Sequence, residues 1–145
     1  MKGIVVGTDG SACSLDAVRW ALGQAALADC PLQVITTWQI ISHIAPKEGV
    51  PQFPADLYEY ERFVRQRLHD DVDPILAERS DVKVELHVVH AAAADALIAA
   101  SRKADLVVIG SRGLGGFIAL ALGSVADQVM RHAYCPVVVV RRQQP

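Results

Sequence analysis

The residues best suited to chemistry in this sequence are the small ones that follow the apolar segment 106–109. Five glycines and a serine punctuate the next stretch, at Gly110, Gly113, Gly115, Gly116, Gly123 and Ser124. Glycine lets backbone N–H groups approach an anion closely and adopts positive φ without strain. A helix N-terminus adds unpaired N–H donors and a favourable dipole. An apolar strand, a glycine-rich loop and a helix start, in this order, predict a loop that binds the phosphate groups of a nucleotide.

The spacing of this loop differs from two common phosphate-binding patterns. The Walker A sequence GxxxxGK[ST] is absent, no lysine follows Lys103, and the loop does not follow a first strand as the dinucleotide fingerprint does. Phosphoryl transfer needs clustered positive charge on the γ-phosphate, and Arg112 is the only cation inside the loop. Arg112 could pair with a phosphate or face solvent. We therefore predict a nucleotide-binding regulatory module that is at most a slow ATPase.

Asp9 is the second candidate, at the end of the first apolar segment. Its carboxylate could bind a ribose hydroxyl or hold Mg²⁺ through water. It could instead bond the backbone of the turn at Gly10 and Ser11. Because binding residues gather in the loops at strand ends, we favour the ligand role. Asp9 and the glycine loop face one crevice if the first and fourth strands are neighbours.

Alternating strands and helices must position these residues. Apolar and β-branched runs predict strands at 3–9, 32–38, 82–89, 106–109 and 137–140. Apolar residues at helical spacing predict helices from Ser11 or Ser14 to Asp29, and at 56–79, 91–103 and 124–133. This alternation indicates an α/β fold, a doubly wound sandwich whose parallel sheet is covered on both faces.

Finer expectations concern single elements. Val125, Val129 and Met130 of the last helix should face the core, and Pro74 should kink the second helix or begin its final turn. Prolines and a glycine interrupt residues 39–55, which should form a functional lid or a disordered segment. Both possibilities stay open.

Composition predicts one domain over residues 1–145 and excludes several classes of protein. The net charge of −2 does not favour a nucleic-acid partner, and no stretch has the length and apolarity of a membrane span. No signal peptide is expected at the start. Cys13, Cys30 and Cys135 do not suggest a disulfide framework, which fits a reducing, cytoplasmic location. A metal site at His132 and Cys135 is not expected.

Three segments resemble the nucleotide-binding branch of the universal stress protein family. They are IVVGTDGSACSLDAVRWA, ADLVVIGSRGLGG and LGSVADQVMRHAYCPVVVV, and the resemblance covers almost the whole chain. ATP-binding members of this family carry G-x2-G-x9-G-[ST]. The chain matches that pattern at Gly110, Gly113, Gly123 and Ser124.

The resemblance implies a five-stranded sheet in the order 3-2-1-4-5 and ATP as the ligand, with or without Mg²⁺. It places Asp9 near the ribose and phosphates and brings the adenine to backbone groups near Thr37. The implied nucleotide-binding residues are Asp9, Thr37, Gly110, Ser111, Arg112, Gly113, Gly115, Gly123, Ser124 and Val125. One departure is that His90-Ala91-Ala92 stands where the family often has glycine and then proline.

The last strand predicts a partner. In the implied order this strand lies at a sheet edge, yet it carries four valines, and a long apolar edge invites association. Family members resemble homodimers paired through this strand, so we expect a homodimer through residues 136–141. Two alternatives to an ATP-binding module remain. One is a dimerising scaffold without nucleotide, and the other is an enzyme whose base comes from residues 39–55, for example His43.

Overall fold

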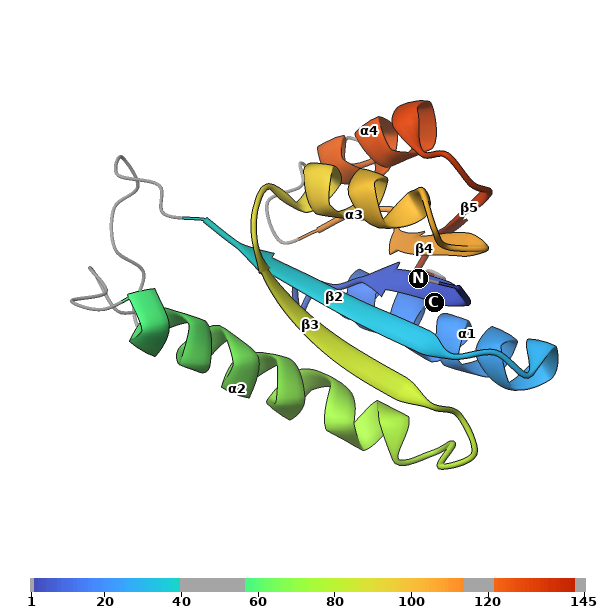
Figure 1. The fold of residues 1–145 in the computed structure, drawn as a ribbon, viewed down its shortest axis with the longest axis horizontal. Helices are drawn as coiled ribbons and strands as arrows, with labels where there is room; N and C mark the ends of the chain where they lie inside the picture. The colour runs from blue at the N-terminus through green and yellow to red at the C-terminus, as the bar shows by residue number, and fades with distance from the viewer. Residues whose placement is uncertain (1, 40–56, 114–121, 143–145) are drawn as a thin grey trace.

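The computed structural model describes residues 2–39, 57–113 and 122–142. Strands and helices alternate strictly along them (Figure 1). The elements are β1 (Ile4–Gly7), α1 (Ala12–Ala28), β2 (Leu32–Trp38), α2 (Leu57–Leu76), β3 (Val84–His90), α3 (Ala93–Ser101), β4 (Leu106–Gly110), α4 (Ser124–His132) and β5 (Val137–Val140). Except for Gln39, the segment 39–55 with His43 lies outside the described residues, as do Gly115 and Gly116.

The five strands form one parallel sheet in the order β3-β2-β1-β4-β5, which confirms the predicted α/β class and strand order. Ile4 of β1 pairs in register with Leu32 of β2 and with Leu106 of β4. The chain winds from β1 towards β3 in its first half and returns to β4 and β5 in its second. The strand order therefore reverses between β1 and β4, where a doubly wound sheet opens a crevice at the carboxyl ends of its strands.

Helices α1 and α2 cover one face of the sheet, and α3 and α4 cover the other (Figure 1). Ile4 and Val6 belong to the core beneath α1 and α2, whereas Val5 belongs to the core beneath α3 and α4. Successive side chains of a strand point to opposite faces, so both sets are buried only when both faces are covered. This explains why β1, β4 and β5 read as unbroken apolar runs in the sequence.

The helix ends follow the local sequence. Ser11 caps α1, because its hydroxyl accepts a hydrogen bond from the Ser14 backbone N–H, and Asp29 ends the helix in the left-handed region at φ 51°. Pro74 lies in the last turn of α2, which ends at Leu76 and is shorter than expected. Within the described part of the chain, no helix combines the length and apolarity that crossing a bilayer requires.

The inward face of α4 is narrower than predicted. Val129 is fully buried and Ala126 nearly so, but Met130 is 51% exposed, and its predicted place in the core is wrong. Neighbouring helical residues point about 100° apart. A nine-residue helix at the margin of the sheet cannot bury both Val129 and Met130.

Candidate functional site: a pocket where the strand order reverses

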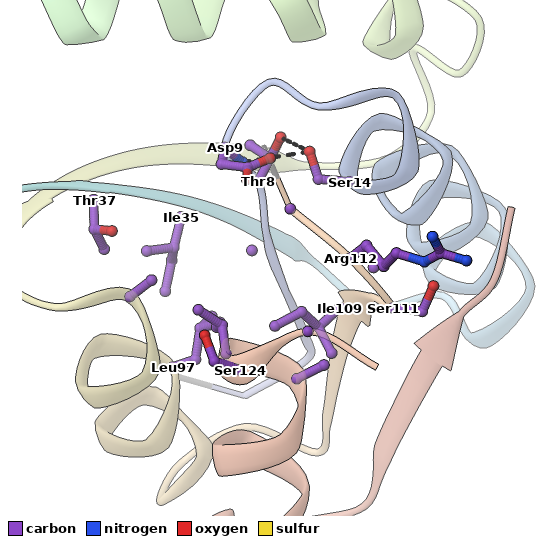
Figure 2. Close-up of a pocket in the computed structure, with 17 residues that line it drawn as sticks. Thr8, Asp9, Ser14, Ile35, Thr37, Leu97, Ile109, Ser111, Arg112 and Ser124 are labelled. Carbon is purple, nitrogen blue, oxygen red and sulfur yellow. Dashed lines mark hydrogen bonds between the residues drawn. The ribbon is translucent and has the colours of Figure 1, made fainter. Parts of the chain in front are cut away.

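A pocket of about 370 Å³ opens at the carboxyl ends of β1, β2 and β4. Its walls also include residues from the first turns of α1 and α4 and from α3. Figure 2 shows Thr8, Asp9 and Ser14 on one side and Leu97 and Ser124 on the other. The volume lies in the range of small-molecule sites.

All the described residues that were predicted from the sequence to bind a nucleotide line this one pocket. They are Asp9, Thr37, Gly110, Ser111, Arg112, Gly113, Gly123, Ser124 and Val125. Gly115 lies outside the described residues. The fold thus brings together residues that are up to 116 positions apart, from Asp9 to Val125 (125 − 9). Their binding of a nucleotide remains a prediction.

The Asp9 turn combines both roles considered for its carboxylate. Oδ1 accepts a hydrogen bond from the Ser11 backbone N–H at 2.9 Å, which is the turn-stabilising role. Oδ2 faces the glycine loop, since a Cβ atom added to Gly113 would lie 2.5 Å from it. Gly10 supplies the positive φ of 83° that this turn requires. One carboxylate oxygen therefore holds the turn, and the other faces the glycine loop.

The start of α4 forms the opposite wall. Gly123 is its N-cap residue, and among the described residues no side chain caps this helix. Ser124 is the first helical residue, one position beyond the N-cap. The Gly123 N–H donates a hydrogen bond to the Ser111 carbonyl at 2.6 Å, and the Ser111 N–H donates one to the Val140 carbonyl at 2.9 Å. These bonds hold the helix start and its following N–H groups against the pocket.

An apolar wall completes the pocket and was missed in the sequence. It consists of Ile35, Ala93, Leu97, Ile109 and Ala126. Leu97 reaches the end of β1 because residue 7 is glycine; a Cβ there would lie 2.8 Å from its Cδ1 atom. Helical and strand periodicity marks such residues as inward-facing, but the same signal marks core residues. Nothing in the sequence separates a core position from a pocket wall.

Charged and titratable groups at the site are few. Arg112 lines the pocket, and in Figure 2 its side chain extends away from Thr37 and Ile35. Behind the loop, the Cys13 thiol lies 3.5 Å from Ser111 Oγ. Burial opposes ionisation of Cys13, but hydrogen bonds from Ser111 and from backbone groups outweigh it, so its pKa lies below the ordinary value. In the described segments, no three His, Cys, Asp or Glu side chains gather closely enough to ligate a metal ion.

Comparison with known proteins identifies similar chains. The family model of the universal stress protein family matches residues 1–141. The universal stress protein MT2699 of Mycobacterium tuberculosis is 32% identical over 142 residues, which cover 97% of this chain and 48% of that protein. The chain thus spans about half the length of the curated relatives it matches first. The universal stress protein MJ0531 of Methanocaldococcus jannaschii is 33% identical over 144 residues, covering 97% of this chain and 82% of that protein.

A solved structure is similar in both sequence and fold. It is described as a universal stress protein in complex with cAMP, and it superposes with a TM-score of 0.69 at 30% identity. The match covers 97% of this chain and 96% of that one.

Proposed function

This chain belongs to the universal stress protein family, and we propose that it is a cytoplasmic, ATP-binding regulatory module of the stress response in which hydrolysis is at most slow. The observation that carries the proposal is that the uncapped start of α4 lines the same pocket as the Asp9 turn. A helix start without its own cap offers N–H groups to an anion. The similar protein solved with cAMP supports an adenine nucleotide.

The pocket offers a distinct wall to each part of ATP. Backbone N–H groups of Gly113, Ser124 and Val125 bind the phosphates, while Gly110, Ser111 and Arg112 frame the loop. Asp9 binds a ribose hydroxyl. The adenine lies against the apolar wall, and backbone groups near Thr37 bind its edge. Mg²⁺ supplies charge neutralisation when bound; Asp9, the carboxylate among the described lining residues, suits this hard cation through water.

The described lining favours binding over rapid turnover. It contains one carboxylate and one arginine, and neither a lysine nor a histidine. Efficient phosphoryl transfer needs several positive groups on the γ-phosphate and a placed base. Asp9 already uses one oxygen to hold its turn. The pocket therefore suits a protein that senses nucleotide occupancy.

Calorimetric titration with ATP tests this function directly. We expect saturable ATP binding, retained nucleotide in native mass spectra of the purified protein, and turnover far below the ~10 per second of a typical enzyme. Turnover near that rate would make the protein a true ATPase. Absence of both retained and added nucleotide would leave the scaffold interpretation.

We also propose a homodimer paired through residues 136–141. β5 is an edge strand of the sheet, and Val137–Val140 are all only partly buried in the single chain. An apolar edge strand with unpaired backbone groups is a template for association. Sedimentation at micromolar concentration should give a dimer that the edge variant Val139→Lys dissociates. A monomeric wild-type chain at that concentration would refute it.

A further inference from the structure

Ser14 is a buried polar residue of the pocket. The proposed contacts to the phosphates and the adenine give its hydroxyl no role. It lies in the first turns of α1, is 5% exposed and lines the pocket beside Asp9. Its hydroxyl has three close partners. These are the Ser11 carbonyl at 2.9 Å, Thr8 Oγ1 at 2.8 Å and the Asp9 backbone N–H at 3.3 Å. Figure 2 shows the bonds to Thr8 and Asp9.

The chemistry of a hydroxyl group fixes the direction of these bonds. Serine has one proton to donate and two lone pairs that accept. Because Ser14 donates its proton to the Ser11 carbonyl, it must accept from both Thr8 Oγ1 and the Asp9 N–H. Thr8 then donates to Ser14 and accepts from the Gly10 N–H at 3.1 Å. The Ser14 hydroxyl thus uses its full bonding capacity.

These bonds restrain the whole turn that carries Asp9. The N–H groups of Asp9 and Gly10 are tied to the two hydroxyls, and the Ser11 N–H is tied to Asp9 Oδ1. With three successive N–H groups held, the carboxylate is kept in the orientation that directs Oδ2 towards Gly113. A side chain held this way loses little conformational entropy when it binds a ligand.

We propose that Ser14 is a positioning residue for nucleotide binding: with Thr8 it holds the Asp9 carboxylate towards the ribose hydroxyls of the ligand. This inference rests on the proposed ATP binding and adds to it a residue that acts through Asp9. It predicts that the contribution of Ser14 depends on the ligand having ribose hydroxyls.

The test compares ATP with 2′,3′-dideoxyATP by calorimetric titration without Mg²⁺, so that the proposed Mg²⁺ role of Asp9 does not contribute. Ser14→Ala should weaken ATP binding roughly tenfold, in line with the loss of about one hydrogen bond, and should leave dideoxyATP binding unchanged. Thr8→Val, which keeps the side-chain shape without the hydroxyl, should behave in the same way. In an Asp9→Ala background, Ser14→Ala should cause no further loss, because coupled residues are not additive.

Ser101→Ala is the matched control. Ser101 is also a buried helical serine; its hydroxyl bonds the Ile98 carbonyl three residues earlier and accepts from the Tyr134 N–H, outside the pocket lining. Its loss should lower stability and leave ATP affinity unchanged.

Two results would overturn the inference: wild-type ATP affinity in both Ser14→Ala and Thr8→Val, or an equal loss for ATP and dideoxyATP. A wild-type protein that binds neither ligand would instead refute the proposed function itself. If Ser14→Ala fails to fold, Thr8→Val decides the question.

Discussion

The starts of α1 and α4 lie at the same pocket but are built in opposite ways. The first turn of α1 is closed by its own side chains, since Ser11 caps it and the Ser14 hydroxyl bonds the preceding turn. The first turn of α4 begins at Gly123, and no side chain among the described residues caps it. The side-chain cap of α1 already takes the Ser14 N–H, whereas in the described residues no such bond takes an N–H of the first turn of α4. This contrast supports the proposal that the phosphates bind at α4 and that α1 holds Asp9.

The two helices also differ in how many of their side chains are buried. α1 buries seven residues against the sheet, whereas α4 buries only Ala126 and Val129. We call α1, which orients Asp9, the frame of the pocket, because many buried side chains hold it in place. The start of α4, which is proposed to bind phosphate, is held by fewer. Elements that respond to ligands are drawn from the less stable parts of a protein. If the chain binds nucleotide as proposed, we expect α4 to be the element that responds to it.

The largest expected effect tests the packing contrast. Leu22→Ala in α1 should lower the free energy of unfolding by about 2–5 kcal/mol, because Leu22 is almost fully buried and its removal leaves a cavity. Val129→Ala in α4 should cost about 2 kcal/mol, and exposed Met130→Ala should stay within about 0.5 kcal/mol. Urea denaturation measures all three. A loss at Val129 equal to or above that at Leu22 would contradict the division into frame and responsive element.

The second prediction concerns the contact between the glycine loop and the Asp9 carboxylate. Gly113→Ala places a Cβ atom 2.5 Å from Asp9 Oδ2, so the carboxylate must turn away and strain its bond to Ser11. The turned carboxylate then loses its proposed hydrogen bond to the ligand; a bond to a charged group contributes about 1.5–3 kcal/mol, so ATP binding should weaken roughly 10- to 100-fold. Gly23→Ala in α1 is the control, because nothing lies within 4 Å of its added Cβ atom. Wild-type affinity in Gly113→Ala would show that Asp9 and the loop act independently.

The third prediction uses proline to remove one N–H group from each helix start. Proline is tolerated at the first helical position, and both Gly123 (ψ 162°) and Ser11 (ψ 154°) have the extended backbone that a following proline requires. Ser124→Pro should weaken ATP binding roughly tenfold, as expected for the loss of a bond to a charged group of about 1.5 kcal/mol. Ala12→Pro, at the equivalent position of α1, should not change the affinity.

Ser124→Ala separates the backbone from the side chain in this comparison. It removes the hydroxyl and keeps the N–H group, so it should bind ATP more tightly than Ser124→Pro. Equal losses in the two proline variants would remove the distinction between the open and closed helix starts.

The sequence predicted this division only in part. Apolar periodicity and glycine breaks were enough for the strands and the helices, because these depend on local patterns. The gathering of Asp9 with Gly110 and Gly123 at one edge also required β1 and β4 to be neighbours, in a strand order that only the family resemblance implied. The hydroxyl pair Thr8 and Ser14 was not predicted as a unit, since its bonds depend on how β1 enters α1 in space. The outward turn of Met130 depends on how little of the sheet α4 covers, which no local pattern reports.

The smallest expected effect is a dependence of stability on pH with opposite signs at two cysteines. In the folded chain the pKa of Cys13 lies below its ordinary 9.0, because hydrogen bonds from Ser111 and backbone groups outweigh burial. Between the lowered pKa and 9.0 the unfolded chain holds more protons, so this group adds stability as pH rises. Burial, with a smaller contribution from Asp105, raises the pKa of Cys135 above 9.0, so stability should fall as pH rises from 9.0.

Denaturation of Cys13→Ala and Cys135→Ala from pH 7 to 10 measures both effects against the wild type. The stability deficit of Cys13→Ala should grow with pH, since the hydrogen bonds to the thiolate are lost with the side chain. Cys135→Ala should gain on the wild type at the alkaline end of the range. A deficit of Cys13→Ala that does not change with pH would mean that Ser111 and the neighbouring backbone groups do not stabilise the thiolate, and that packing alone holds Cys13 against the glycine loop.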